Sequence, residues 1–206
     1  DQNLAQSRAL IPQPDYTLPD IPARRTAGPD EDYQRYEITA DGVSPMAIPG
    51  TAFSTYVADG LEHTPTGKPS TAAADHAAQL DKRLRKIEQF EYGELWADVR
   101  GEGETAILTW GSTTAAAREA AERLLDSGVN VKVIAIRLLM PARPEDLAEV
   151  LAGVRRVLVV EQSHGLQFHR YLRSYYDIGA ELRNLARPGP LLITPGEIVQ
   201  SIEEWK

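Results

Sequence analysis

The sequence predicts an α/β fold: an open, mostly parallel sheet with helices on both faces, preceded by an extended arm. From residue 104 onward, short apolar segments alternate with segments of helical periodicity in the order β-α-β-α-β-α-β-α, which is typical of parallel sheets. The first 32 residues instead contain five prolines and few apolar residues, which favours extended backbone. We therefore predict an arm over 1–32, a connecting region over 33–103 and an α/β domain over 104–206.

The arm has two interpretations, and the sequence leaves both open. Proline fixes φ and lacks a backbone N–H, so a segment with prolines every few residues does not build a packed core of its own. The arm is either a linker or a strap that lies on a neighbouring domain or subunit.

The connecting region begins with a loop whose backbone is closely constrained. Tyr36–Ile38 is a candidate short strand, and Asp41-Gly42 is a turn signal, because glycine adopts positive φ without penalty. Pro45 and Pro49 hold the residues before them in extended geometry. We expect a loop of defined shape that continues to residues 60–63, and ordered loops of this length are typically functional.

Residues 72–92 are predicted to form an amphipathic helix. Its apolar residues recur at spacings of three and four, which places them on one stripe. They are Ala77, Leu80, Leu84, Ile87 and Phe90. The basic pairs Lys82-Arg83 and Arg85-Lys86 lie mostly off that stripe. We interpret these pairs as a solvated helix face or, alternatively, as a docking patch for an acidic partner or a phosphate.

The α/β domain is predicted from the change of period along the chain. The expected strands are 105–110, 131–136, 156–160 and 180–185, and the expected helices are 114–126, 144–151, 166–176 and 195–205. In the first of these helices, the residues expected to face inward are Ala117, Ala120, Ala121, Leu124 and Leu125. Gly128 is expected to end that helix in the left-handed conformation.

A candidate anion site lies at the end of the first predicted parallel strand. Open parallel sheets bind ligands beyond the carboxyl ends of their strands, and free N–H groups at a helix start attract anions. Gly111 and Ser112 occupy that junction and are candidate contacts for a phosphate or carboxylate. Ser112 or Thr113 equally fits a simple helix N-cap. Arg137 and the segment 161–164 stand at the ends of the next two strands.

The composition argues against several classes of function. The chain has no cysteine, so it offers no thiolate for an iron–sulfur cluster, a disulfide or nucleophilic catalysis, and this fits a reducing compartment; we expect a cytoplasmic protein. Its formal net charge of -8 argues against binding to nucleic acid or to an anionic membrane. No apolar run reaches the ~18 residues that span a bilayer.

No catalytic or metal-binding constellation is evident. His164 and His169 are five residues apart, which does not suit a shared zinc site on one helix face. The Gly101-Glu102-Gly103 segment precedes a strand instead of following one, so it predicts a turn and not a dinucleotide-binding loop. We therefore predict no catalytic residue and no metal ligand, and a binding or assembly domain instead of a complete enzyme.

Several motifs resemble a known family. The Gly-Ser helix start, the Arg137–Pro141 segment RLLMP and the segment VVEQSHGLQ over 159–167 together resemble the C-terminal domain of transketolase-like thiamine diphosphate enzymes. The stretch YEITADGVSPMAIPGT over 36–51, GLEH over 60–63 and RPGP over 187–190 look like the α subunit of 2-oxoacid:ferredoxin oxidoreductases, nearest the 2-oxoglutarate type. The family pattern has arginine where Met46 stands and glycine where Leu166 stands.

The resemblance implies a C-terminal portion of such an α subunit. The whole enzyme would decarboxylate a 2-oxoacid on thiamine diphosphate with Mg²⁺, pass electrons through a [4Fe-4S] cluster to ferredoxin, and transfer the acyl group to coenzyme A. None of these cofactors is expected in this chain; they would belong to the β subunit and the remaining α-subunit domains, and we expect an oligomeric assembly. Four residues are nominated for a coenzyme A or substrate channel: Ser44, Glu62, His63 and Lys68.

A second hypothesis comes from a different class of protein. The chain would then be a free-standing α/β module that binds a small molecule or nucleotide at residues 111–113 and 161–164. It would bind a phosphorylated ligand alone, whereas an α-subunit fragment would be active only within its complex.

Overall fold

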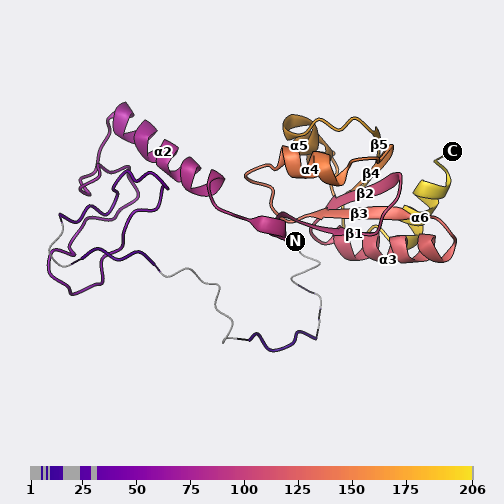
Figure 1. Cartoon of the computed structure of the whole chain (residues 1–206), viewed down its shortest axis with the longest axis horizontal. Coiled ribbons are helices and arrows are strands. Elements are labelled where there is room, and N and C mark those ends of the chain that lie inside the picture. The colour runs from indigo at the N-terminus through magenta and orange to yellow at the C-terminus, as the bar shows by residue number, and fades with distance from the viewer. Residues whose placement is uncertain (1–5, 7, 9, 16–23, 29–31, 206) are drawn as a thin grey trace. The chain divides into compact units, whose positions relative to one another are not determined.

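The computed structural model describes residues 6, 8, 10–15, 24–28 and 32–205 (Figure 1). The chain divides into two compact units: a loop–helix unit, Leu10–Glu91, and a sheet unit, Tyr92–Lys206. Most of the predicted arm lies outside the described residues. Its described end does not behave as a free linker, because the backbones of Arg25 and Ala27 exchange hydrogen bonds of 2.8 and 2.9 Å with Met46 in the loop of the same unit.

Five strands form one sheet in the order β1-β3-β2-β4-β5. They are β1 (Ala97–Arg100), β2 (Thr105–Trp110), β3 (Val131–Ile136), β4 (Arg156–Glu161) and β5 (Glu181–Ala186). Strands β2 to β5 pair in parallel, which confirms the predicted sheet, and β1 joins β3 antiparallel at the edge. The prediction missed β1 because its sequence, ADVR, has no apolar run. The sheet unit therefore begins before residue 104.

Helices cover both faces of the sheet, as predicted. Helices α3 (Thr113–Asp126) and α6 (Pro195–Glu203) lie on one face, and α4 (Pro144–Val150) and α5 (Gln167–Tyr175) lie on the other (Figure 1). Alternate residues of one strand feed the two cores: Ile107 packs with Leu124 and Ile198, whereas Leu108 packs with Leu147 and Leu172. This is the pattern of a strand buried on both sides.

One helix departs from expectation in the direction that it faces. Helix α2 (Ala73–Glu88) turns Gln79 and Lys82 into the loop–helix unit, while Leu80 and Leu84 of its apolar stripe remain 47% and 50% exposed. Among the described residues of this unit, no apolar side chain reaches full burial. The interpretation of the whole basic run as a solvated face was therefore wrong for Lys82, and the stripe supplies no core within the unit.

Two smaller expectations are also corrected. Tyr36–Ile38 forms no strand; Tyr36 sits in a turn whose backbone N–H donates to the carbonyl of Pro65. Leu125 of α3 is 61% exposed, because it lies one position past the buried row that includes Leu124. Gly128 does end α3 with φ of +80°, as predicted.

Candidate functional site

The loop at 41–44 is shaped to lie directly on α2. Gly42 has φ of +72°, and a Cβ atom there would stand 2.5 Å from the carbonyl oxygen of Lys82 and 2.7 Å from the backbone nitrogen of Lys86. Such distances are far inside van der Waals contact, so only glycine fits. Asp41 fixes the turn by accepting hydrogen bonds from the Val43 N–H and the Arg25 guanidinium. The predicted turn signal therefore sets a contact between a loop and a helix.

Glu62 ties the second half of the loop to the same helix. Its carboxylate accepts two hydrogen bonds from Arg83, at 2.8 and 3.2 Å, and its Oε2 lies 2.9 Å from Nδ1 of His76. The hydrogen bonds from Arg83, followed in importance by that with His76, lower the pKa of Glu62 to about 2. Next to it, His63 is buried, stacks on the Tyr36 ring at 4.4 Å between centroids and lies 3.3 Å from Asp59. Glu62 and His63 thus hold the loop in place.

The Glu62 pair predicts a sensitivity to acid. Because the folded state lowers the pKa of Glu62, the carboxylate stabilises the unit fully above its ordinary pKa of 4.5, and this contribution is lost as pH falls from there toward 2. We expect Glu62→Gln to destabilise the unit at pH 7, and the difference from wild type to shrink across that window. Urea denaturation at several pH values measures it. Glu88→Gln, at an exposed site on α2, is the control, and an equal pH dependence of both variants would contradict the assignment.

Lys82 is a buried ammonium group beneath the loop. Its Nζ donates to the carbonyl of Tyr36 at 3.2 Å and to the Ser44 hydroxyl at 3.0 Å, and Ser44 in turn donates to the carbonyl of Glu37. Only 6% of Lys82 is exposed. Burial, followed by the positive charges of Arg83 and Arg35, lowers the pKa of Lys82 to about 8. Lys82 is thus a buried cation whose hydrogen-bond acceptors are neutral oxygens.

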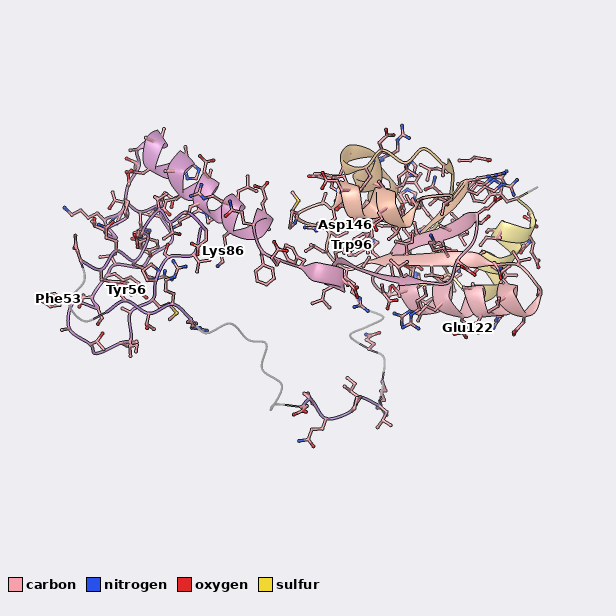
Figure 2. The ribbon with its side chains drawn as sticks, viewed as in Figure 1. Phe53, Tyr56, Lys86, Trp96, Glu122 and Asp146 are labelled. Carbon is pink, nitrogen blue, oxygen red and sulfur yellow. The ribbon has the colours of Figure 1, made fainter. Side chains whose placement is uncertain are left out.

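Lys82 and Ser44 form the floor of a cavity of about 350 Å³ that we call the cationic pocket. The remaining lining side chains are mostly basic and come from three segments: the end of the arm, the loop and α2. The lining residues are Arg24, Arg25, Arg35, Gly42, Val43, Ser44, Met46, Lys82, Arg83 and Lys86. Figure 2 labels Lys86 on α2, and the loop that holds Ser44 packs against the same helix.

The structure thus separates the four residues nominated from the sequence. Ser44 lies in the cationic pocket, Glu62 and His63 brace the loop, and Lys68 is an exposed residue on the turn at 64–68 that the Thr64 backbone closes. The basic residues of the pocket were not nominated individually. The signal for them was the basic run on α2, which had been given a phosphate-docking alternative.

The strand-end candidates meet at the expected edge of the sheet. The carboxyl ends of β2 and β4 are neighbours there, since β3 and β4 flank β2 on opposite sides. A cavity of about 290 Å³ at this point is lined by Ser112, Gln162 and Glu119 among others. Gly111 leads into it with φ of +65°. Glu119 adds a carboxylate to this cavity, which weakens it as an anion site.

The segment 161–164, which begins with the last residue of β4, has a structural role. Glu161 is buried and accepts hydrogen bonds from the N–H groups of Phe168 and His169, both 2.9 Å, and from the Ser163 hydroxyl. It therefore satisfies the free N–H groups at the start of α5. Gln162 binds the carbonyls of Arg187 and Leu191 and the N–H of Ile193. Three of the four side chains at 161–164 are therefore engaged within the chain.

Leu166 stands in a backbone conformation that suits glycine. It precedes α5 with φ of 53° and ψ of 47°, the left-handed region, which costs a residue with a side chain about 1–2 kcal/mol. We expect Leu166→Gly to stabilise the sheet unit by about 1 kcal/mol, since the strain relieved exceeds the added chain entropy of glycine. Thermal unfolding measures the gain. Leu191→Gly, at an exposed position, is the control; a loss of stability in Leu166→Gly would show that its side chain packs productively.

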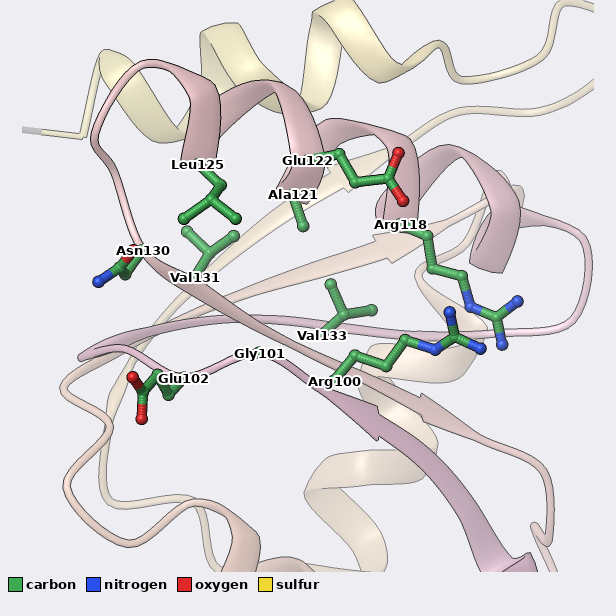
Figure 3. A pocket seen from close by; sticks show the side chains of 10 residues that line it. All are labelled: Arg100, Gly101, Glu102, Arg118, Ala121, Glu122, Leu125, Asn130, Val131 and Val133. Atoms are coloured by element: carbon green, nitrogen blue, oxygen red, sulfur yellow. The ribbon is translucent and has the colours of Figure 1, made fainter.

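A third depression lies between α3 and the edge of the sheet (Figure 3). Its floor is apolar, formed by Val131, Val133 and Leu125, and Arg100 and Arg118 stand at its rim. Both arginines are engaged by Asp98, a residue of β1 that also binds Arg137. The depression lies beside the start of β3, away from the carboxyl ends where such sheets bind ligands.

Two further features bear on function. Within the part of the chain that the structure describes, no group of three or more His, Asp or Glu side chains is arranged to hold a metal ion. None of the helices in those same residues is long and apolar enough to cross a membrane.

Comparison with known proteins places this geometry in a family. Residues 96–168 match the model for the transketolase C-terminal domain. The chain is 34% identical over 186 residues to the α subunit of 2-oxoacid:ferredoxin oxidoreductase 2 of Aeropyrum pernix, covering 86% of this chain and 29% of the relative. It is 30% identical over 175 residues to the corresponding α subunit of Saccharolobus solfataricus, covering 80% of this chain and 27% of the relative.

A solved structure extends the likeness to the three-dimensional level. It is the 2-oxoglutarate:ferredoxin oxidoreductase of Magnetococcus marinus with 2-oxoglutarate, coenzyme A and succinyl-CoA bound. Its TM-score is 0.78 at 33% identity, covering 94% of this chain and 34% of that chain. The chain thus spans about three tenths of the length of these relatives.

The sheet and its matched residues define an α/β domain of the transketolase C-terminal class. The chain as a whole belongs with the α subunits of 2-oxoacid:ferredoxin oxidoreductases, which confirms the resemblance seen in the sequence.

Proposed function

We propose that this chain serves as the C-terminal part of the α subunit of a thiamine-diphosphate-dependent 2-oxoacid:ferredoxin oxidoreductase, with 2-oxoglutarate as the substrate. The observation that carries the proposal is the extent of the likeness to the Magnetococcus marinus enzyme, which covers 94% of the chain and so includes the loop–helix unit as well as the sheet unit. The complete enzyme oxidatively decarboxylates the 2-oxoacid to its acyl-CoA and passes the electrons to ferredoxin, in the cytoplasm.

The first role of the chain in this enzyme is assembly with the β subunit and the remaining domains of the α subunit. The exposed stripe on α2 supports this role, because Leu80 and Leu84 lie about half exposed on a unit that buries no apolar side chain fully among its described residues. A surface of this kind gains stability when another apolar surface covers it.

The second role is to form one wall of the channel for coenzyme A or substrate. Ser44 supports it, since this residue opens into the cationic pocket. Glu62 and His63 contribute by holding the loop that carries Ser44, and Lys68 contributes an exposed ammonium group on the adjoining turn.

The residues of this chain do not fit the enzyme's thiamine diphosphate–Mg²⁺ or [4Fe-4S] groups. The sequence has no cysteine, and its described carboxylates and imidazoles form no metal-binding cluster. These groups therefore belong to the parts of the enzyme beyond this chain.

Turnover tests the proposed function. The α subunit that contains this chain, purified with its β subunit, should reduce ferredoxin when supplied with 2-oxoglutarate and coenzyme A together, and not with either alone. The 206-residue chain by itself should show no turnover with the same additions. Turnover by the free chain would overturn the proposal. So would a purified complex that fails to reduce ferredoxin with every 2-oxoacid tested.

A further inference from the structure

The charge of the cationic pocket is not balanced from within. Among the residues that the structure describes, its lining includes six basic side chains and no acidic one: Arg24, Arg25, Arg35, Lys82, Arg83 and Lys86. The chain as a whole is acidic, with a formal net charge of -8, so the pocket is a local concentration of positive charge and not part of a basic surface. Mutual repulsion among these groups destabilises the unit unless an anion accompanies them.

Two of the six charges are neutralised nearby. Arg25 pairs with Asp41, and Arg83 pairs with Glu62. The other four form no ion pair with any carboxylate among the described residues: Arg24, Arg35, Lys82 and Lys86. The pocket therefore holds four cations that have no ion-pair partner within the described part of the chain.

The contacts of three of these groups, Lys82, Arg24 and Arg35, leave donors free for a ligand. Lys82 donates to two neutral oxygens, those of Tyr36 and Ser44, and an ammonium group has three protons to donate. Arg24 meets the sulfur of Met46 at 3.4 Å, and a thioether is a weak acceptor. Arg35 lies over the rings of Tyr36 and Tyr56, with 5.6 Å from its Cζ to each centroid, which leaves its N–H edge uncommitted by these contacts.

Lys82 gives the second, independent indication of an anion. It is almost fully buried and forms no ion pair with a carboxylate of the described residues, and burial together with the positive charges of Arg83 and Arg35 lowers its pKa to about 8. A buried unpaired cation destabilises a fold, whereas a buried cation paired with an anion is largely compensated. A lysine retained at such a position is best explained by a ligand that supplies the negative charge.

We propose that the cationic pocket binds a phosphate group. Guanidinium and ammonium donors from several directions suit a doubly charged tetrahedral oxyanion better than a planar carboxylate, and about 350 Å³ admits a phosphate ester or diphosphate. The phosphate belongs either to a nucleotide-bearing ligand such as coenzyme A or to a free inorganic ion. Where the phosphate is that of coenzyme A, the assignment deepens the proposed function and rests on it, whereas binding of an inorganic phosphate stands without it.

The test is a calorimetric titration of the 206-residue chain at low salt with four probes: pyrophosphate, coenzyme A, dephospho-coenzyme A and pantetheine. We expect binding of pyrophosphate and coenzyme A, no binding of pantetheine, and weakening with added NaCl. A preference for coenzyme A over dephospho-coenzyme A would assign the nucleotide's 3′-phosphate, and binding of pyrophosphate alone would assign an inorganic source. Absence of binding by every phosphate probe would overturn the proposal.

Three substitutions test whether the phosphate binds in the pocket or is attracted by positive charge elsewhere on the chain. Lys82→Met should weaken binding about tenfold or more while leaving the melting temperature equal or higher, because the buried charge is removed and both of its acceptors keep another hydrogen-bond partner. Lys86→Met, at the exposed rim, should weaken binding without touching a buried site. Arg173→Gln, which removes an exposed charge on α5, should change nothing. Equal losses in all three variants would show non-specific attraction and refute the site.

The state of the pocket is checked in the same samples. Hydrogen exchange of the α2 amides shows whether the loop–helix unit is folded, and bound phosphate should slow it. If these amides exchange freely, the same variants are titrated in the intact α subunit with its partner. There Lys82→Met should still weaken the binding of coenzyme A or pyrophosphate, and an unchanged affinity would overturn the proposal. A pocket that binds phosphate in an enzyme without 2-oxoacid turnover would remove the proposed function and leave this inference standing.

Discussion

Replacing Gly42 by alanine is expected to detach the loop from α2 and to destabilise the loop–helix unit by about 3 kcal/mol or more. The added methyl group would stand 2.5 Å from the carbonyl of Lys82 and 2.7 Å from the N–H nitrogen of Lys86, and both are backbone atoms of a helix that cannot move aside separately. The left-handed φ of +72° adds to the strain. Native-state hydrogen exchange of the α2 amides reports the loss, as faster opening of that helix alone.

Gly50 provides the matched control for this change. It also has positive φ, +88°, but a Cβ atom there meets nothing within 4 Å. Gly50→Ala should therefore cost only the conformational strain, about 1 kcal/mol. Equal effects of the two substitutions would show that backbone conformation, and not the contact with α2, explains the glycine at 42. Because Ser44 follows two residues later, Gly42→Ala should also lower the affinity of the cationic pocket for a ligand.

Glu161→Ala is expected to destabilise the sheet unit by about 3 kcal/mol. The carboxylate accepts from the N–H groups of Phe168 and His169, and its removal leaves both at the start of α5 without their acceptor. The favourable interaction of a negative charge with the N-terminal end of that helix is lost as well. Urea denaturation followed by far-UV circular dichroism measures the difference in the free energy of unfolding.

Two further variants serve as controls for Glu161→Ala. Glu161→Gln keeps one acceptor oxygen and should cost roughly half as much. Glu119→Ala removes an exposed carboxylate from α3, where its surface pair with Arg123 contributes at most about 0.5 kcal/mol. A Glu161→Ala variant as stable as Glu119→Ala would contradict the capping role. Glu161 would then again be a candidate ligand contact.

Gly42 and Glu161 belong to the two motifs that carry the family resemblance, and these motifs have different roles in the structure. The segment after β4 stabilises the domain, because its polar side chains close backbone groups of α5 and of the 187–193 loop. The loop at 41–44 instead brings Ser44 to the cationic pocket. Both motifs carry the family resemblance, yet only the second faces a cavity suited to an anion.

Much of the sheet unit could be predicted from the sequence. The strand segments 105–110 and 131–136 coincide with β2 and β3, because runs of apolar and β-branched residues bounded by turn signals have few alternatives. The antiparallel strand β1 could not be predicted in the same way: Ala97–Arg100 is paired through its backbone with β3, and that pairing depends on register and not on local pattern.

The candidate site was predicted only in part. Ser44 and the turn at Asp41-Gly42 could be recognised, because Pro45 restricts the backbone conformation of the residue before it and Gly42 permits the positive φ of a turn. Arg24 and Arg35 could not, because one or two arginines in a polar segment carry no sign of the partners that folding brings to them. Lys82 was hidden by an amphipathic pattern that indicated the opposite face of α2 as the buried one.

The sequence by itself determined the strands and helices of the parallel sheet and their order, since period and turn chemistry are properties of neighbouring residues. It also determined the family, through motifs that lie in both units. Only the tertiary structure decided which face of α2 is buried, which of the four nominated residues reach a pocket, and which of the motif's side chains are already satisfied. The physical reason is the same in each case: burial, pKa shifts and ion pairing depend on contacts between residues far apart in the chain, such as Ser44 with Lys82, and local pattern does not specify them.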